Sequence, residues 1–338
     1  MKIAIIRLSA LGDIVHSTVV LQIIKKYYPE AIIDWFTETS MATVLNDHPH
    51  INTIHTLSLK NVLKAKRILP LIKTVITLLQ LKPYDRIIDM QGLIKSAIIT
   101  RIIGKNSHGY NRKSVREEIS TFFYKTTSNI SYEENSIIRN CMLCADALQI
   151  PFCIDDVFNK GPSLYYHNTN GFEFDGLIAS DRLNIAFVIG SSWPSKNYPK
   201  EKFVELANMI DANILILWGN KEEKKKAIWI ASQCSNATVL PGLSFNSLKA
   251  LIDKVDLTIG NDSGPTHIAW AMNSPSIVLF GPTPVERMFE TKKNLALKSS
   301  SAINHYKLNK NDWSIAEIEA DAIAKMAEKL LKRPLSNS

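Results

Sequence analysis

Short apolar runs rich in isoleucine and valine recur along the first half of the chain and alternate with longer amphipathic segments. Four of these runs predict strands, at residues 2–8, 31–37, 51–57 and 85–90. Between them, residues 17–28 and 62–82 repeat apolar positions with a period of about 3.6 residues, which predicts helices. Such alternation is typical of parallel sheets that are covered by helices on both faces.

A second series of the same kind begins after residues 159–181, a stretch of Gly, Pro, Asn and Asp without a clear period. Its predicted strands are residues 184–190, 213–219, 237–242, 256–262 and 276–282. Helices are expected at 201–210 and 247–255, and an amphipathic helix at 314–333.

The two series predict an α/β fold with two doubly wound, Rossmann-like parallel-sheet domains, residues 1–165 and 178–313. We expect the helix at 314–333 to pack back on the first domain. Because ligands of open parallel sheets lie at the carboxyl ends of the strands, the expected site is a cleft between the two domains.

The charge is uneven along the chain. There are 40 Lys and Arg against 32 Asp and Glu, a net charge of +8, and residues 1–165 hold 20 basic against 14 acidic residues. This favours a phosphorylated or otherwise polyanionic partner for the first domain, although solvated lysines give the same count. The first apolar run is too short for a secretory signal and no stretch reaches the length of a membrane span, so we expect a cytoplasmic protein.

Two basic clusters and one further lysine account for much of this excess. These side chains could form a phosphate-binding rim, and solvated helix faces are the alternative. They are Lys60, Lys64, Lys66 and Arg67 in the first cluster, Arg112, Lys113 and Arg116 in the second, and Lys95.

Residues 257–272, LTIGNDSGPTHIAWAM, contain the sharpest chemical signal of the second series. A strand ends near Gly260, and a helix starts at Asp262, Ser263 and Gly264, with His267 on its first turn. The amide groups and positive dipole of such a helix start bind phosphate. Ordinary capping by Asp262 or Ser263 is the alternative, and the two readings are compatible.

Two other strand ends carry side chains that could bind a diphosphate or a ribose. Ser191 and Ser192 follow the strand at 184–190, and the ammonium of Lys196 lies in the same loop, where it would neutralise a diphosphate. Glu222 and Glu223 follow the strand at 213–219, a position from which a carboxylate accepts hydrogen bonds from ribose hydroxyls. A surface loop and a solvated helix start are the alternatives.

Some motifs are absent from the chain. It has no Asp-x-Asp pair to hold a divalent cation on a diphosphate, no Walker loop and no three-glycine dinucleotide loop. Cys141 and Cys144 lie on a predicted helix without a second pair or a histidine cluster, which favours buried thiols over a metal site. We therefore expect neither a metal nor a cofactor.

The stretch RLSALGDIVHS, residues 7–17, turns from a strand into a helix with a single glycine. Asp13 stands beside that glycine, either as a helix cap or as a carboxylate directed into a site.

Taken together, these motifs resemble the bacterial lipopolysaccharide heptosyltransferases, which are inverting glycosyltransferases of the GT-B fold. The matching pieces are SALGDIVHS, DMQGLIKSA, SKNYP, LWGNKEE and GNDSGPTHIAWAM followed by LFGPT, in family order. DWFTE and DMQGLIKSA are similar to the first heptosyltransferase rather than the second. The chain departs from the family in SSWPSK, where the stretch before the lysine is often richer in Asp and Arg.

The resemblance implies transfer of L-glycero-D-manno-heptose from ADP-heptose to the Kdo of Kdo-lipid A, at the cytoplasmic face of the inner membrane. It implies that Asp13 is the base. It also implies that Lys196, the two serines before it and the helix start at Ser263 and Gly264 stabilise the departing ADP. Glu222 or Glu223 would bind the ribose, and the basic clusters would bind the phosphates and carboxylates of the acceptor. It implies peripheral contact with the anionic membrane surface and no nucleic acid. The alternatives are the second heptosyltransferase or another sibling, a sugar-nucleotide epimerase, and a non-catalytic polyanion binder.

Overall fold

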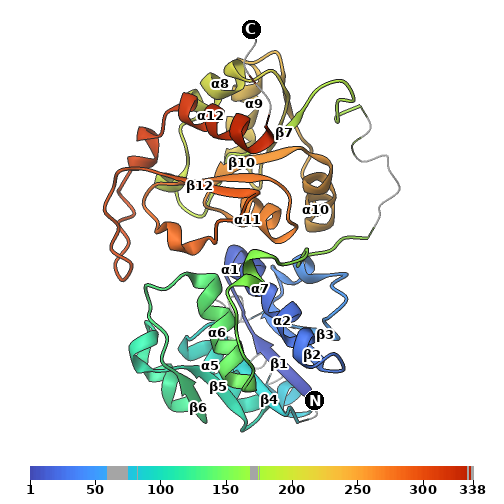
Figure 1. Ribbon diagram of the computed structural model, residues 1–338, viewed down its shortest axis with the longest axis vertical. Coiled ribbons are helices and arrows are strands. Elements are labelled where there is room, and N and C mark those ends of the chain that lie inside the picture. The colour runs from blue at the N-terminus through green and yellow to red at the C-terminus, as the bar shows by residue number, and fades with distance from the viewer. Residues whose placement is uncertain (59–74, 82, 168–173, 175, 333–334, 336–338) are drawn as a thin grey trace. The chain divides into compact units, whose positions relative to one another are not determined.

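The computed structural model describes residues 1–58, 75–81, 83–167, 174, 176–332 and 335. The chain forms two compact units, Met1–Ser163 and Leu164–Ser338, and each contains one sheet (Figure 1). The predicted fold class, two doubly wound α/β units with parallel sheets, is confirmed.

The first unit is built on six parallel strands in the order β3-β2-β1-β4-β5-β6. The strands are β1 Lys2–Ile6, β2 Ile32–Glu38, β3 Thr53–Leu57, β4 Arg86–Asp89, β5 Ser107–Tyr110 and β6 Thr126–Ser128. The helices are α1 Leu11–Ser17, α2 Val19–Tyr27, α5 Ile94–Ile103, α6 Ser136–Leu148 and α7 Asp155–Phe158. The helix expected at 17–28 begins earlier, and Thr18 separates it into α1 and α2.

The second unit repeats this arrangement in the order β12-β11-β10-β7-β8-β9. The strands are β7 Asn184–Val188, β8 Asn213–Leu217, β9 Ala237–Val239, β10 Leu257–Asn261, β11 Ser276–Phe280 and β12 Asn294–Lys298. The helices are α8 Lys200–Met209, α9 Lys221–Ala231, α10 Phe245–Lys254, α11 Gly264–Ala271 and α12 Ala320–Leu331.

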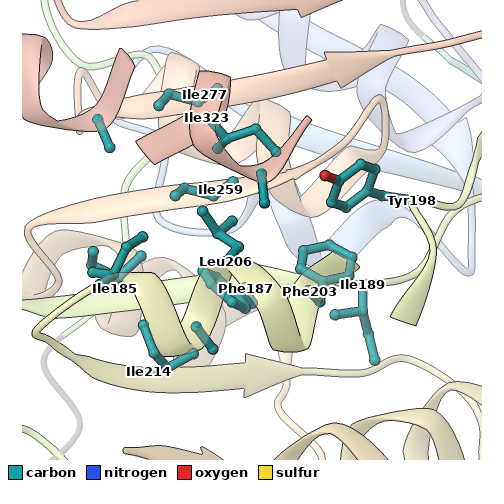
Figure 2. Close-up of a cluster of buried hydrophobic side chains, with 14 of the residues drawn as sticks. Ile185, Phe187, Ile189, Tyr198, Phe203, Leu206, Ile214, Ile259, Ile277 and Ile323 are labelled. Carbon is teal, nitrogen blue, oxygen red and sulfur yellow. The ribbon is translucent and has the colours of Figure 1, made fainter. Parts of the chain in front are cut away.

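One face of the second sheet packs on α8, α9 and α12 (Figure 2). Ile185, Phe187, Ile259 and Ile277 alternate along their strands with residues of the opposite face, as a pleated strand requires, and lie in one cluster with Phe203 of α8, whose ring packs on that of Phe187. All five side chains are fully buried or nearly so. The burial of each such side chain stabilises the unit by about 1.5–3 kcal/mol before chain entropy is subtracted.

The C-terminal helix belongs to this core. Ile323 and Ala327 of α12 lie in the same cluster, and the Tyr198 hydroxyl donates to the carbonyl of Ile318 at 2.8 Å. Lys202 of α8 also forms an ion pair with Glu319 at 3.0 Å. The expectation that this helix packs on the first domain is therefore wrong, because its apolar face covers the second unit's own sheet.

Each sheet has one point at which the strand order reverses, between β1 and β4 and between β7 and β10. Loops that leave two neighbouring strands in opposite directions at such a point open a crevice at the carboxyl ends of the strands. The segments that follow these four strands carry Asp13, Gln91, Lys196 and Asp262. The fold thus places the candidate residues where doubly wound units bind ligands.

Candidate active site

The loops after β7 and β10 meet in a buried charged cluster. The Lys196 ammonium lies 2.7 Å from Asp262 Oδ2, and the two side chains are 6% and 5% exposed. His267 Nε2 lies 2.8 Å from Asp262 Oδ1. The Thr283 hydroxyl, in the loop after β11, donates to Asp262 Oδ2 at 2.8 Å. The Asp262 carboxylate thus holds Lys196 in place from a second loop.

Opposing effects act on the pKa of the Asp262 carboxyl. Burial raises it, but the Lys196 charge, the His267 hydrogen bond and the more distant Arg287 charge together hold it well below its usual range. The carboxyl is therefore ionised at neutral pH, and the cluster contains a buried ion pair. Such a pair persists only when hydrogen bonds satisfy both carboxylate oxygens, and here His267 contacts Oδ1 while Thr283 donates to Oδ2, the oxygen that Lys196 also contacts.

Helix α11 starts directly beside this cluster. Ser263 is its N-cap residue, but the Ser263 side chain makes no capping hydrogen bond; its Oγ lies 3.3 Å from the Thr266 hydroxyl. That hydroxyl donates to the Asn261 carbonyl at 2.8 Å. Capping by the Ser263 side chain, the alternative to phosphate binding, is therefore not formed, and α11 begins two residues after Asp262, the partner of Lys196.

The loop before Lys196 is tied down by its own side chains. The Ser191 hydroxyl is within hydrogen-bond distance of Asn197 Oδ1, at 2.7 Å, and of the Trp193 carbonyl, at 3.0 Å. Ser192 is exposed. The Ser195 hydroxyl, for which we predicted no role, donates to the Lys310 carbonyl at 2.7 Å. Of the two predicted serines, Ser191 shapes the turn, whereas Ser192 presents its hydroxyl to solvent.

The two glutamates of α9 differ in direction. Asn220 caps α9, and the Glu223 carboxylate folds back to accept from the Gly219 amide at 2.7 Å and from Asn220 Nδ2 at 2.6 Å. A Cβ at Gly190 would collide with this carboxylate, so Glu223 lies against the loop after β7. Glu222 is exposed and pairs with Lys225 at 2.8 Å. Glu223 is thus the one at the strand ends.

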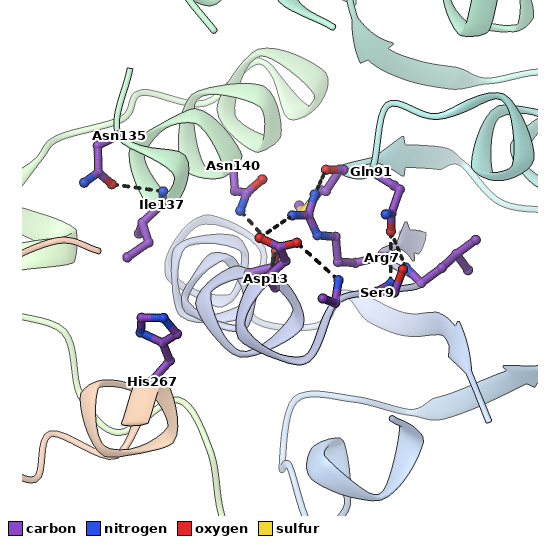
Figure 3. A network of polar contacts seen from close by, with 12 residues as sticks. Arg7, Ser9, Asp13, Gln91, Asn135, Ile137, Asn140 and His267 are labelled. Atoms are coloured by element: carbon purple, nitrogen blue, oxygen red, sulfur yellow. Dashed lines mark hydrogen bonds and ion pairs between the residues drawn. The ribbon is translucent and has the colours of Figure 1, made fainter. Parts of the chain in front are cut away.

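In the first unit, Asp13 lies in the first turn of α1 (Figure 3). Its Oδ2 accepts from the Ala10 amide at 3.2 Å, and its Oδ1 lies 3.2 Å from Arg7 Nη2. The Asp13 side chain is 44% exposed. Capping of the α1 start and access to a reactant are therefore compatible at Asp13.

The loop after β4 is hydrogen-bonded to the loop that leads from β1 to the helix of Asp13. Gln91 Oε1 accepts from the Leu8 amide at 2.8 Å and from the Ser9 amide at 3.0 Å (Figure 3). Asp89 is fully buried; burial raises the pKa of its carboxyl, although the Tyr124 hydroxyl and the Gln91 amide donate to it. Of the residues in DMQGLIKSA, only Lys95 had a predicted role, because sequence patterns do not report hydrogen bonds between loops.

Two of the predicted acceptor residues lie in neighbouring segments. Lys95 is half-buried in the first turn of α5, and Arg116 is exposed in the loop after β5. Next to Arg116, Glu117 Oε2 accepts from the Ile94 amide at 2.7 Å, which ties this loop to the start of α5. The remaining predicted acceptor residues lie outside the described residues: Lys60, Lys64, Lys66 and Arg67.

Within the described part of the chain, no group of three or more His, Cys, Asp and Glu side chains is arranged to hold a metal ion. Cys141 and Cys144 are buried on α6 as free thiols, and burial raises the pKa of Cys144 to about 12. No helix among the residues described is both long and apolar enough to cross a membrane.

Two doubly wound units, each with candidate residues at its switch point, have the architecture of the GT-B fold, which the solved heptosyltransferase structures share. Residues 73–314 match the sequence profile of glycosyltransferase family 9 (heptosyltransferase), and the chain belongs to this family. It is therefore a glycosyltransferase.

Curated relatives and solved structures agree with this assignment. Lipopolysaccharide heptosyltransferase 1 of Campylobacter coli is 36% identical over 98% of this chain and 99% of its own length. The Pseudomonas aeruginosa enzyme of the same name is 27% identical over 84% of this chain and 79% of its own. The structure of E. coli heptosyltransferase WaaC with ADP-2-deoxy-2-fluoro heptose superposes with a TM-score of 0.77 at 22% identity, covering 97% of this chain and 99% of that one.

Proposed function

We propose that this protein is an inverting heptosyltransferase that moves L-glycero-D-manno-heptose from ADP-heptose to the Kdo of Kdo-lipid A in lipopolysaccharide inner-core biosynthesis. The observation that carries the proposal is the end-to-end similarity to the first heptosyltransferase of C. coli, in a chain that belongs to family 9. The donor nucleotide follows from the E. coli relative, whose solved structures contain ADP and an ADP-heptose analogue.

The second unit would hold the donor. Lys196 and the start of α11, at Ser263 and Gly264, supply positive charge for the diphosphate, and Asp262 with His267 fixes that ammonium. Ser192 would donate to a phosphate oxygen, and Glu223 would accept from the ribose hydroxyls. Ser191 and Glu222 have the weaker claim, since Ser191 is used within its loop and Glu222 faces solvent.

The first unit would hold the acceptor. Asp13 would take the proton of the acceptor hydroxyl as that oxygen attacks the anomeric carbon from the face opposite the leaving group. Because the departing ADP is stabilised by fixed positive charge, the reaction needs no metal at the diphosphate. Lys95, Arg116 and the predicted cluster at Lys60, Lys64, Lys66 and Arg67 would bind phosphates and carboxylates of the acceptor.

The test is a transfer assay with three acceptor conditions. We expect ADP-heptose and Kdo-lipid A to yield ADP and a heptosylated lipid of inverted anomeric configuration. Transfer only to an acceptor that already carries heptose would instead identify the second heptosyltransferase or another sibling. Donor conversion without any acceptor would identify an epimerase.

We also propose peripheral contact with the anionic cytoplasmic face of the inner membrane. The excess of basic residues in the first 165 positions supports it. Co-flotation with vesicles of anionic lipid at low salt, lost at high salt, is the expected result. Absence of co-flotation at low salt would contradict this part of the proposal.

A further inference from the structure

Arg7 occupies an unusual position for a charged residue. It directly follows β1, its amide donates to the Phe36 carbonyl of β2 at 3.1 Å, and its side chain is only 12% exposed. Arg7 Nη1 donates to the carbonyl of Met90, and Arg7 Nη2 lies 3.2 Å from Asp13 Oδ1 (Figure 3). One guanidinium thus links the loop after β4 to the candidate base.

The partners of this guanidinium are themselves fixed. The Met90 amide donates to the Ile6 carbonyl at 3.0 Å, and Gln91 binds two amides of the loop after β1. The Arg7 guanidinium that contacts Asp13 is therefore itself held in place by hydrogen-bonded loops. A buried and braced guanidinium loses little entropy when it binds a carboxylate, and its planar donors fix the direction of the contact.

The Asp13 carboxylate has room for a reactant. Its two oxygens offer about four acceptor positions, of which Arg7 and the Ala10 amide take one each. The Asp13 side chain is 44% exposed, so the remaining acceptor positions are open to a reactant. The carboxylate is thus held at two points and open at the others.

Among the described carboxylates, Asp13 is the one within ion-pair distance of Arg7. The nearby buried Asp89 has other donors, because its oxygens accept from the Gln91 amide and the Tyr124 hydroxyl. Arg7 also lies close enough to Tyr110 to act on its pKa, which burial nevertheless raises. The charge of Arg7 is therefore matched by Asp13.

We propose that Arg7 is the positioning residue for Asp13: it holds the carboxylate in the orientation that receives the acceptor proton. The inference rests on the proposed function. In the step it serves, the acceptor oxygen bonds to the anomeric carbon while the bond from that carbon to the phosphate oxygen breaks. The electron pair of the broken bond leaves with ADP, and the hydroxyl proton moves to Asp13.

The test is a double-mutant cycle measured on kcat with ADP-heptose and Kdo-lipid A. Arg7→Met keeps an unbranched apolar stem and removes the guanidinium; we expect kcat to fall about 100-fold. We expect the KM values of both substrates to stay within about threefold, because the substrates bind elsewhere. Arg7→Lys keeps the charge but reaches one partner, so most of the lost kcat should return.

Asp13→Asn separates a positioning role from an independent one. If Arg7 acts through Asp13, adding Arg7→Met to Asp13→Asn lowers the residual kcat by less than about threefold. A full 100-fold loss in the Asp13→Asn background overturns the inference, as does a rise in acceptor KM with kcat unchanged. Full activity of Asp13→Asn alone overturns the proposed base itself, which is a different result.

Controls guard against a folding defect. Arg101→Met removes an exposed arginine from α5 of the same unit and should leave kcat unchanged. Arg7→Met must retain a cooperative thermal transition, and its kcat must be measured below that transition. If Arg7→Met lacks the transition, Arg7→Gln, which also removes the charge, carries the cycle. A loss of kcat on adding Arg7→Gln to Asp13→Asn that equals its loss in the wild type then overturns the inference equally well.

Discussion

Removing the carboxylate of Asp262 is the sharpest perturbation of the second unit. In Asp262→Asn, Lys196 keeps its buried position but loses the negative charge at 2.7 Å, and the contacts of His267 and Thr283 change partner. Breaking a buried pair by removal of one charge costs about 3–5 kcal/mol. Because asparagine keeps an oxygen in place, we expect the free energy of unfolding to fall by the lower end of this range, about 3 kcal/mol.

The assay is thermal unfolding at neutral pH. A loss of about 3 kcal/mol in a unit of this size lowers Tm by about 6–12 °C. Asp253→Asn is the matched control: this exposed carboxylate of α10 accepts one hydrogen bond, from the Tyr166 hydroxyl at 2.8 Å, and its loss should cost less than about 1 kcal/mol. Equal Tm values for the two variants would refute the reasoning.

The pH dependence of the free energy of unfolding tests the role of Asp262 independently. The pKa of Asp262 is lowered in the folded state, so its contribution to stability is fully present above the pKa of the unfolded chain. That contribution is lost as the pH falls from about 4 toward the lowered value. The free-energy difference between wild type and Asp262→Asn should therefore shrink below about pH 4. A difference that grows on acidification would contradict the assigned direction.

The remaining predictions concern the donor site. Glu223→Gln should raise the donor KM about tenfold, whereas Glu222→Gln should leave it unchanged, as steady-state kinetics will show; equal effects would contradict the choice of Glu223. Gly190→Ala should weaken ADP binding in calorimetry, because its methyl group displaces the Glu223 carboxylate, while Gly161→Ala, which meets only ordinary contacts, should not. Turnover should persist in excess EDTA, and a loss that magnesium restores would contradict a metal-free diphosphate site.

The pattern of apolar runs was sufficient to predict two doubly wound units and nine of their strands. It missed β5, β6 and β12, because SHGY and TTS are mostly polar or small and NLALK holds only three apolar residues between polar ones. It also assigned α12 to the wrong unit. The amphipathic pattern of a helix reports that one face is buried, but not which of two similar sheets covers it.

Sequence reasoning was stronger for residues that follow strands than for residues that support them. Asp13, Lys196 and Asp262 were predicted as candidates because strand ends of parallel sheets converge at the switch points, and the structure places them there. Arg7, Gln91 and Thr283 were missed because their roles are contacts between loops distant in the chain. The structure directs Glu223 rather than Glu222 toward the strand ends, and adjacent positions on a helix do not reveal such a direction in the sequence.

The central claim is that the carboxylate of Asp13 accepts the acceptor proton while the second unit holds the departing ADP. Its most direct test is the single-turnover rate of Asp13→Asn with bound ADP-heptose and saturating Kdo-lipid A, together with ADP affinity by calorimetry. We expect unchanged ADP affinity and a rate at least about 100-fold below wild type. A wild-type rate in Asp13→Asn would contradict it.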